Sequence, residues 1–334
     1  DSNRFIETSL VNKGDFSPDY TLIAVVQEML GSFFLDNLKA SKAFFLYGES
    51  GQNGKSTFTK LVRKIIGNQF CSSLALSNLG EKFGLAPLIG MKVNIRDELD
   101  DKFGSSKIFK ELVTGERVAD QHKYGQPFEF ENRAKFLFSS NVIATFDGID
   151  NGLRRRLLFI PFYREFKDGD VDKDFDLDEK LEREIPGIVG WALEGAKRLV
   201  SNSYKFSDSK AVKTAMDEFD DDASSAIRFF RENYVVDIEM QIWTPINKIY
   251  EDYLFWMQSE GTKKFIGKKR FIKDIKVVWR NLDTRIMRSK YDEYGVGKHL
   301  THLNCYIKDD NHEEETIIIA ETDEELAKQL NLSV

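Results

Sequence analysis

The stretch that decides the fold is residues 44–58, which read FFLYGESGQNGKSTF. Its first four residues are apolar or aromatic and predict a β-strand, and the residues from 60 to 66 continue in a helical pattern. A glycine-rich loop between a strand and a helix lets backbone N–H groups and the positive end of the helix approach phosphate oxygens. We therefore predict a phosphate-binding loop in an α/β protein.

The residue types within this loop indicate ATP and Mg²⁺ as its ligands. Lys55 is expected to contact the β- and γ-phosphates of ATP, and Ser56 is expected to bind Mg²⁺. The remaining predicted phosphate-binding residues are Gly51, Gln52, Asn53, Gly54 and Thr57. Five residues separate Gly48 from Gly54, whereas the usual pattern has four. The register of the loop before Gly54 is therefore open.

Composition limits the classes of protein to consider. The chain has 334 residues, 41% hydrophobic and 31% charged, which is typical of a globular protein of two or three domains. It contains no apolar run long enough to span a bilayer and no N-terminal signal peptide, so we expect a cytoplasmic protein without a membrane partner. Its two cysteines are expected to be reduced. A start at Asp1 rather than Met suggests a piece of a longer protein.

Charge is distributed unevenly along the chain. The formal net charge is −7, yet the segment from Thr262 to Lys290 contains eleven Lys or Arg residues and two Asp residues. A localised basic surface allows an acidic protein to bind nucleic acid. Acidic runs elsewhere are expected to be solvated helix faces.

The order of predicted elements suggests several regions. Strands are expected at Ala43–Tyr47, Lys92–Arg96, Ala134–Ser139 and Leu157–Pro161, with helices at Tyr20–Leu38, Leu181–Val200 and Ala223–Asn233. Helices at Ile246–Ser259 and Lys269–Leu282, followed by a glycine-containing turn at 295–297, suggest a winged helix-turn-helix. The expected domains are a helical segment 1–40, an ATPase core 41–165, a helical region 166–238, a winged-helix-like DNA-binding domain 239–308 and an acidic tail 309–334.

Two carboxylates follow the second main strand. Asp97 and Glu98 come directly after residues 92–96, about 40 positions beyond Lys55. In ATPases with a phosphate-binding loop, one acid at such a strand end holds Mg²⁺, and a second acid can accept a proton from the attacking water. Asp97 fits the first role and Glu98 the second.

Polar residues also flank the last two strands. Asn141 ends the strand Ala134–Ser139 and could position water against the γ-phosphate, although an asparagine often just ends a strand in a turn. Arg154, Arg155 and Arg156 precede the strand Leu157–Pro161. Arginine supports charge on a transferring phosphoryl group, and Arg155 and Arg156 are the candidates, the alternative being a basic surface loop.

A hairpin is expected between the acid pair and Asn141. Residues 121–130 read QHKYGQPFEF, with Gly-Gln-Pro between two polar-aromatic arms. At the tip, Lys123 could contact a phosphate while His122 and Tyr124 stack on bases or sugars. The alternative is an exposed turn with an ordinary surface lysine.

The order of these motifs resembles that of superfamily 3 helicases, and in particular the phage, plasmid and poxvirus primase-helicase family. Residues 52–56 match its phosphate-loop ending, residues 109–116 its motif before the hairpin, and residues 155–162 its arginine-finger strand. Residues 186–193 are similar to its helix after the core, and residues 249–256 to the opening of its C-terminal winged domain.

The resemblance implies an AAA+-like P-loop ATPase core, built as a hexameric ring around one DNA strand with ATP between subunits. It also implies movement from 3′ to 5′ on single-stranded or forked DNA, with the hairpin lysine in the pore and Lys110 as a further DNA contact. A primase or primase-polymerase domain often precedes this motor in the same chain. We therefore expect an ATP-dependent DNA helicase of a phage, virus or mobile element.

Two other functions stay open. An initiator could bind origin DNA through the basic winged domain and use ATP only as an assembly switch. An AAA+ protein remodeller is less consistent with the sequence, because its pore loop would be aromatic and apolar rather than His-Lys-Tyr. Stimulation of ATP hydrolysis by single-stranded DNA distinguishes a motor from a switch.

Overall fold

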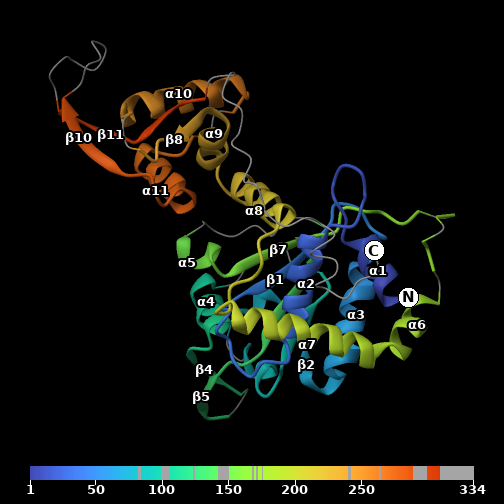
Figure 1. The fold of residues 1–334 in the computed structure, drawn as a ribbon. Helices are drawn as coiled ribbons and strands as arrows, with labels where there is room; N and C mark the ends of the chain where they lie inside the picture. The colour runs from blue at the N-terminus through green and yellow to red at the C-terminus, as the bar shows by residue number, and fades with distance from the viewer. Residues whose placement is uncertain are drawn as a thin grey trace. The chain divides into compact units, whose positions relative to one another are not determined.

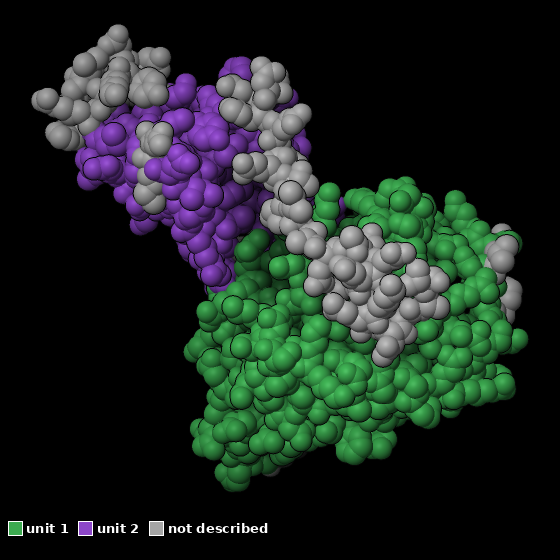
Figure 2. Space-filling view, viewed as in Figure 1, with its two compact units in different colours: residues 1–147, 152–217, 319–334 green, residues 148–151, 218–318 purple. Residues whose placement is uncertain are grey.

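The computed structural model describes residues 1–81, 84–98, 105–122, 125–141, 150–167, 169–170, 172–174, 176–239, 242–262, 265–288 and 299–308. The chain divides into two compact units (Figure 2). Of the described residues, those within 1–141 and 152–217 belong to unit 1, and 150–151 and those within 218–308 belong to unit 2. The five-part division expected from the sequence stays a prediction, and its acidic tail lies outside the described residues.

Unit 1 is built on a five-stranded parallel sheet with the strand order β2-β3-β6-β1-β7 (Figure 1). The strands are β1 (Ala43–Tyr47), β2 (Cys71–Ser72), β3 (Val93–Arg96), β6 (Lys135–Ser140) and β7 (Leu157–Pro161). The four strands expected from the sequence are thus confirmed to within one residue. Strand β2 was not expected, because two residues are too few to give a periodic signal.

The two faces of the sheet bury alternate side chains, as the pleat of a strand requires. On one face, Phe44 and Leu46 of β1 join a core shared with helices α2 (Tyr20–Ser32), α3 (Lys55–Ile66) and α7 (Ile185–Ser201). On the other face, the Phe45 ring lies 5.0 Å from that of Phe138 on β6. Phe109 of helix α4 (Ser106–Thr114) packs on this second face, beside Phe136. The sheet therefore lies between two helical layers.

Helices α2 and α7 approach each other closely because each carries a glycine at the contact. A Cβ atom added to Gly31 would lie 2.3 Å from the Ala196 backbone nitrogen, and one added to Gly195 would lie 2.2 Å from the Gln27 carbonyl oxygen. Across the same interface Arg198 Nε donates to the fully buried Glu28 carboxylate at 2.7 Å. The close packing and this ion pair together hold α7 against α2 on one face of the sheet.

Two predicted helices differ from those observed. The helix expected at Tyr20–Leu38 ends at Ser32, because Phe34 and Leu35 donate to carbonyls three residues back and tighten the chain into turns. The helix expected at Leu181–Val200 is two helices, α6 (Leu177–Arg183) and α7. Pro186 stands in the first turn of α7, where its missing N–H is tolerated but a continuous helix is broken.

The remaining elements of unit 1 are short and lie around the sheet. They are α1 (Ser2–Ser9), η1 (Asn68–Phe70), η2 (Leu76–Asn78), η3 (Ala86–Leu88), β4 (Arg117–Gln121), β5 (Pro127–Glu131) and α5 (Asn151–Arg154, which begins in unit 2). Helix α8 (Lys210–Ala223) runs across the sequence boundary between the units. Strands β4 and β5 form an antiparallel hairpin, so the predicted hairpin is confirmed.

Unit 2 combines helices with a small antiparallel sheet. Its elements are α9 (Ser225–Asn233), β8 (Tyr234–Val236), β9 (Thr244–Pro245), α10 (Ile246–Ser259), α11 (Lys268–Val278), β10 (Thr284–Arg288), β11 (His299–Leu303) and β12 (Cys305–Ile307). The three-stranded sheet has the order β10-β11-β9, and β8 pairs with β12. An aromatic core joins the helices, with the rings of Tyr253 and Phe271 at 4.9 Å. The predicted glycine turn at 295–297 lies outside the described residues.

Within the part of the chain that the structure describes, none of the helices has the length and apolar character needed to cross a bilayer.

Candidate nucleotide-binding site

The predicted site residues gather at the carboxyl edge of the parallel sheet. Strand β1 leads into Gly48, β3 into Asp97 and β6 into Asn141. The connection from β1 leads to β2 at one edge of the sheet, and the connection from β6 leads to β7 at the other edge, so the chain changes direction between β1 and β6. Ligands of open parallel sheets bind outside the carboxyl ends of the strands at such a point.

The loop from β1 to α3 has a conformation that its glycines explain. Gly54 precedes α3 with a φ of 87°, in the left-handed region that side chains disfavour. A Cβ on Gly48 would lie 2.2 Å from Asn53 Nδ2 and 2.7 Å from the Phe162 carbonyl oxygen, so this position also requires glycine. Gly51 has open space around it. The loop therefore has two constrained glycines at its ends and one unconstrained glycine between them.

Contacts with the segment after β7 support the loop. Gln52 has a φ of 53°, its carbonyl accepts from Phe166 N at 2.8 Å, and its side-chain oxygen accepts from Lys173 Nζ at 2.9 Å. Asn53 Nδ2 closes the loop internally by donating to the Ser50 carbonyl at 2.8 Å. Sequence reasoning missed Lys173, because no local pattern links it to a loop 121 residues away.

Lys55 and Asn141 are the two predicted site residues that the structure brings into direct contact. The Lys55 ammonium donates to Asn141 Oδ1 at 2.8 Å and to the Gly48 carbonyl at 2.9 Å. Its side chain is buried, and burial lowers the pKa of Lys55 to about 8. A buried ammonium is costly unless an anion or polar partners surround it. The hydrogen bond between Lys55 and Asn141 is therefore consistent with both side chains binding the same ligand.

The acid pair directly follows β3, which is next to β6 in the sheet. Asp97 Oδ2 lies 3.7 Å from Arg63 NH2 of α3, and the carboxylate stays half exposed. Glu98 is exposed and forms no hydrogen bond or ion pair with the other described residues. The register pairs the last residue of β3, Arg96, with Phe138, two positions before the end of β6. Asp97 and Glu98 therefore lie level with the last two residues of β6.

The donor set at this edge fits Mg²⁺ together with a nucleotide. Ser56 in the first turn of α3 is exposed, and Asp97 supplies carboxylate oxygens. Across the described residues, no three His, Cys, Asp or Glu side chains are grouped so as to hold a metal ion. Mg²⁺ commonly takes only one or two protein ligands and completes its shell with water and substrate phosphates. Ser56 and Asp97 would be those ligands.

The two candidate arginines have different surroundings. Arg156 is 7% exposed, and its NH1 donates to the Gly152 carbonyl at 2.5 Å, within its own turn. Arg155 is exposed and forms no hydrogen bond or ion pair with another residue that the structure describes. Only an exposed guanidinium can reach a second molecule, so the geometry favours Arg155 over Arg156 as a residue acting in trans.

The hairpin places part of the predicted DNA-contacting set at the β4–β5 turn. The ring of the exposed His122 stacks on Phe128 with centroids 4.7 Å apart, while Lys123 and Tyr124 lie outside the described residues. Lys110 is half-buried on α4 and does not belong to the hairpin. Sequence reasoning missed Phe128, although the alternation of aromatic residues along β5 was a signal for an exposed stacking surface.

Unit 2 carries a basic surface on α11. Lys269, Lys273 and Arg280 are exposed, and none of them forms an ion pair with a carboxylate among the described residues. Arg270 differs, since its Nε lies 3.6 Å from Asp274. Lys269 and Lys273 are four residues apart and therefore lie on one side of α11, and Arg280 follows two residues after the helix ends at Val278. Cations without acidic partners are available to phosphates.

Comparisons with known protein families and curated sequences add two findings. A family described as a family of unknown function, DUF5906, matches residues 46–156. The sequence is 25% identical over 189 residues to the "Putative helicase L207/L206" of Acanthamoeba polyphaga mimivirus. That match covers 52% of this chain but only 18% of the relative, so the chain spans less than a fifth of the viral protein.

Solved structures reveal a shared fold. The apo structure of the NrS-1 C-terminal region (305–718) has a TM-score of 0.54 and 15% identity, covering 91% of this chain and 74% of that one. An A-form apo structure of the same region gives 0.53 and 15%, covering 90% of this chain and 74% of that one. At this identity the likeness is one of fold. It supports the α/β class expected from the sequence and extends over both units.

Proposed function

We propose that this chain is the ATP-hydrolysing motor of a replication-associated DNA helicase from a virus, phage or mobile element. The observation that carries the proposal is the Lys55 ammonium, held 2.8 Å from Asn141 where β1 and β6 end. Residues 86 positions apart meet at the point of a parallel sheet where a phosphate is expected. The similarity to the "Putative helicase" of mimivirus supports DNA unwinding as the use of that chemistry.

Each site residue then has one part in the reaction. Lys55 and the loop residues 51–57 bind the phosphates of ATP, while Ser56 and Asp97 hold Mg²⁺, which neutralises charge on those phosphates when bound. Glu98 accepts a proton from water as the water oxygen forms a bond to the γ-phosphorus. The bond from that phosphorus to the bridging oxygen breaks, and ADP leaves. Asn141 orients the water.

The assembly we propose is a superfamily 3 hexamer that moves 3′ to 5′ along single-stranded DNA. Its support is the order of motifs in the sequence together with the exposure of Arg155, which would reach the ATP of a neighbouring subunit. His122, Lys123 and Tyr124 of the hairpin, with Lys110 nearby in sequence, would contact the strand in the pore. A primase domain elsewhere in a longer chain and a host cytoplasmic location belong to the same proposal.

ATP hydrolysis, measured with and without single-stranded DNA, tests the proposal. A motor should hydrolyse ATP slowly alone and much faster with DNA, and should separate a forked duplex in the same buffer. Absence of hydrolysis under both conditions would contradict it.

A second candidate function is an initiator that uses ATP only as a switch. The observation that favours it is α11, whose exposed Lys269 and Lys273 form no ion pair within the described part of the chain. The order of helices and strands in unit 2 supports a winged helix-turn-helix, in which the second helix of the pair enters the major groove. An initiator should bind duplex DNA well and show little stimulation of hydrolysis by single strands.

A further inference from the structure

One residue of the phosphate-binding loop has a backbone conformation that its side chain disfavours. Gln52, three positions before Lys55, has a φ of 53°, in the left-handed region that residues other than glycine seldom occupy. Gln52 is exposed, so burial of its side chain does not explain this conformation. A disfavoured backbone conformation persists only where the surrounding structure imposes it. The hydrogen bonds that Gln52 makes with the rest of the chain therefore decide the shape of the loop.

The chain that follows β7 holds Gln52 at two points. Phe166 N donates to the Gln52 carbonyl oxygen at 2.8 Å, and Lys173 Nζ donates to its side-chain oxygen Oε1 at 2.9 Å. The same part of the chain also bonds the start of the loop, where Phe162 N donates to the Tyr47 carbonyl at 2.6 Å. Both the main chain and the side chain of Gln52 are thus held from outside the loop.

Lys173 is kept in place by its neighbour Asp172. The Asp172 carboxylate accepts from Arg4 NH2 of α1 at 2.7 Å and from Arg164 NH2 at 2.6 Å, and these hydrogen bonds lower the pKa of Asp172. The side chains of Arg164 and Asp172 are only 23% and 22% exposed, so solvent screens their attraction less than that of a surface pair. The Arg164 guanidinium also lies 4.9 Å from the centre of the Phe166 ring. Asp172 therefore links both contacts of Gln52 to α1.

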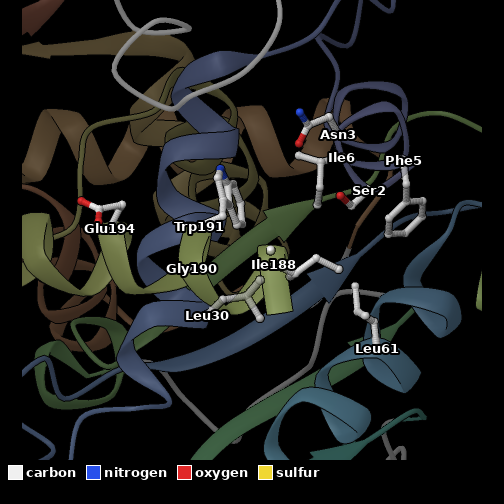
Figure 3. A pocket seen from close by; sticks show the side chains of 11 residues that line it. Ser2, Asn3, Phe5, Ile6, Leu30, Leu61, Ile188, Gly190, Trp191 and Glu194 are labelled. Atoms are coloured by element: carbon white, nitrogen blue, oxygen red, sulfur yellow. The ribbon is translucent and has the colours of Figure 1, made fainter. Parts of the chain in front are cut away.

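Helix α1 is itself packed against the core of unit 1. Phe5, directly after Arg4, is buried and lines an apolar cavity of about 440 Å³ together with Leu61 of α3 and Ile188 of α7 (Figure 3). Phe5 also lies against the loop, since a Cβ built on Gly54 would be 3.2 Å from its Cε2. Arg4 therefore extends from a helix whose position is set by the core, and it passes that position on to the chain after β7.

We propose that Lys173 is a positioning residue for the phosphate-binding loop. It sets the conformation of Gln52, and through Gln52 it directs the backbone N–H groups before Lys55 toward the phosphate oxygens of ATP. Lys173 acts through Gln52 and does not contact the nucleotide itself. A loop that already has its binding conformation loses less freedom when ATP binds, so its affinity for ATP is higher. The inference rests on the proposed function, because it concerns the site that binds ATP there.

A double-mutant cycle between Lys173 and Gln52 tests whether one residue acts through the other. Lys173→Met, Gln52→Met and the double variant keep side chains of similar length and remove the hydrogen bond. The KM for ATP and kcat are measured by phosphate release with Mg²⁺ present, and the melting temperature of each variant is recorded without nucleotide. Lys167→Met is the matched control, because Lys167 is an exposed cation in the same part of the chain.

We expect Lys173→Met to raise the KM for ATP by about fivefold and to leave kcat unchanged, because the loop has the same conformation in the ATP complex and in the transition state. Gln52→Met should raise KM by a similar factor, and the double variant should be no worse than either. Lys173→Arg should restore most of the wild-type KM, since a guanidinium can also donate to Gln52. Lys167→Met should match the wild type. A merely structural role of Lys173 would instead lower the melting temperature and leave KM unchanged.

Two results would overturn the inference and leave the proposed function standing. A wild-type KM in Lys173→Met would mean that the hydrogen bond to Gln52 does not affect the loop. A further rise of KM when Lys173→Met is added to Gln52→Met would mean that Lys173 acts on the nucleotide directly. Failure of the wild type to bind and hydrolyse ATP would overturn the proposed function, and this inference with it.

Discussion

The sheet edge of unit 1 and the α11 surface of unit 2 both present cations, but they do so in opposite ways. Lys55 is buried, held by Asn141 and the Gly48 carbonyl, and its pKa is lowered by burial. Lys269 and Lys273 are exposed and have no acidic partner within the described residues. A buried cation acts through its fixed position relative to a ligand. Exposed cations act together through their summed charge, which salt screens. Substitution of Lys55 at the sheet edge should therefore have an all-or-none effect, whereas substitution of the cations on α11 should have a graded effect.

The largest effect should come from Lys55→Ala. The variant loses the charge that binds the β- and γ-phosphates, so hydrolysis should fall to background with and without DNA. Phosphate release is the measurement. Lys64→Ala is the control, because Lys64 lies on the same helix but pairs with Glu182 at 2.7 Å near the surface. Substantial hydrolysis by Lys55→Ala would show that the buried cation is not essential, and the contrast with the α11 surface would then fail.

Arg155→Ala should lower hydrolysis by about 10³–10⁵-fold, the range known for loss of an arginine finger. Mixing it with Lys55→Ala subunits should restore some activity, since one type of mixed interface contains an intact site. Arg156→Ala should instead lower the melting temperature, because this side chain is buried in its own turn. No rescue in a mixture shown to co-assemble would contradict action of Arg155 in trans.

Glu98→Gln should bind ATP normally but hydrolyse it about 10²–10⁴-fold more slowly, since an amide cannot accept the proton from water. Equilibrium binding of ATP and single-turnover hydrolysis separate the two steps. Glu179→Gln, at an exposed carboxylate on α6, is the matched charge control. A wild-type rate in Glu98→Gln would assign the base to another residue.

The α11 surface should respond in a graded way. Lys269→Gln with Lys273→Gln removes two phosphate contacts, so the log–log salt dependence of duplex binding should become shallower by about 1.8. Fluorescence anisotropy on a labelled duplex at several salt concentrations measures this slope. Lys205→Gln with Lys213→Gln makes the same change of charge in unit 1. ATP hydrolysis without DNA should be unchanged, and an unchanged slope would exclude α11 as the duplex contact.

The smallest effect is a pH dependence of nucleotide binding. With its pKa lowered to about 8, Lys55 loses its positive charge as the pH rises through that value, so ATP affinity should fall between pH 8 and 9.5. In Lys55→Arg this fall should vanish, because the guanidinium stays charged. Any residual ATP binding by that variant can be followed by calorimetry. Equal pH dependence in both proteins would indicate a different titrating group.

Stability should change in the opposite direction. A lysine whose folded pKa lies below its unfolded value of 10.5 disfavours folding while it is charged. That cost is present below about pH 8 and is relieved as the pH rises from 8 to 10.5, because the unfolded chain then binds more protons. Lys42 and Lys135, whose pKa values burial also lowers to about 8, should add to the same trend.

The sequence alone determined the elements and the chemical types of the site. Short runs of apolar residues located four strands, and Gly-Lys-Ser after a strand located the loop, because these signals depend only on neighbours in the chain. The same local signals located the acid pair and the hairpin. They overextended the helix from Tyr20, since nothing local marks the turns after Ser32.

Only the tertiary structure decided which of these residues act together. It brought Lys55 to Asn141, separated exposed Arg155 from buried Arg156, and set Trp191 of α7 and Phe5 of α1 in the wall of one cavity. Each of these outcomes depends on packing between elements far apart in sequence, such as the approach of α7 to α2 through Gly31 and Gly195. A residue pattern specifies what a side chain can do, and burial against distant elements decides whether it meets a partner, a ligand or solvent.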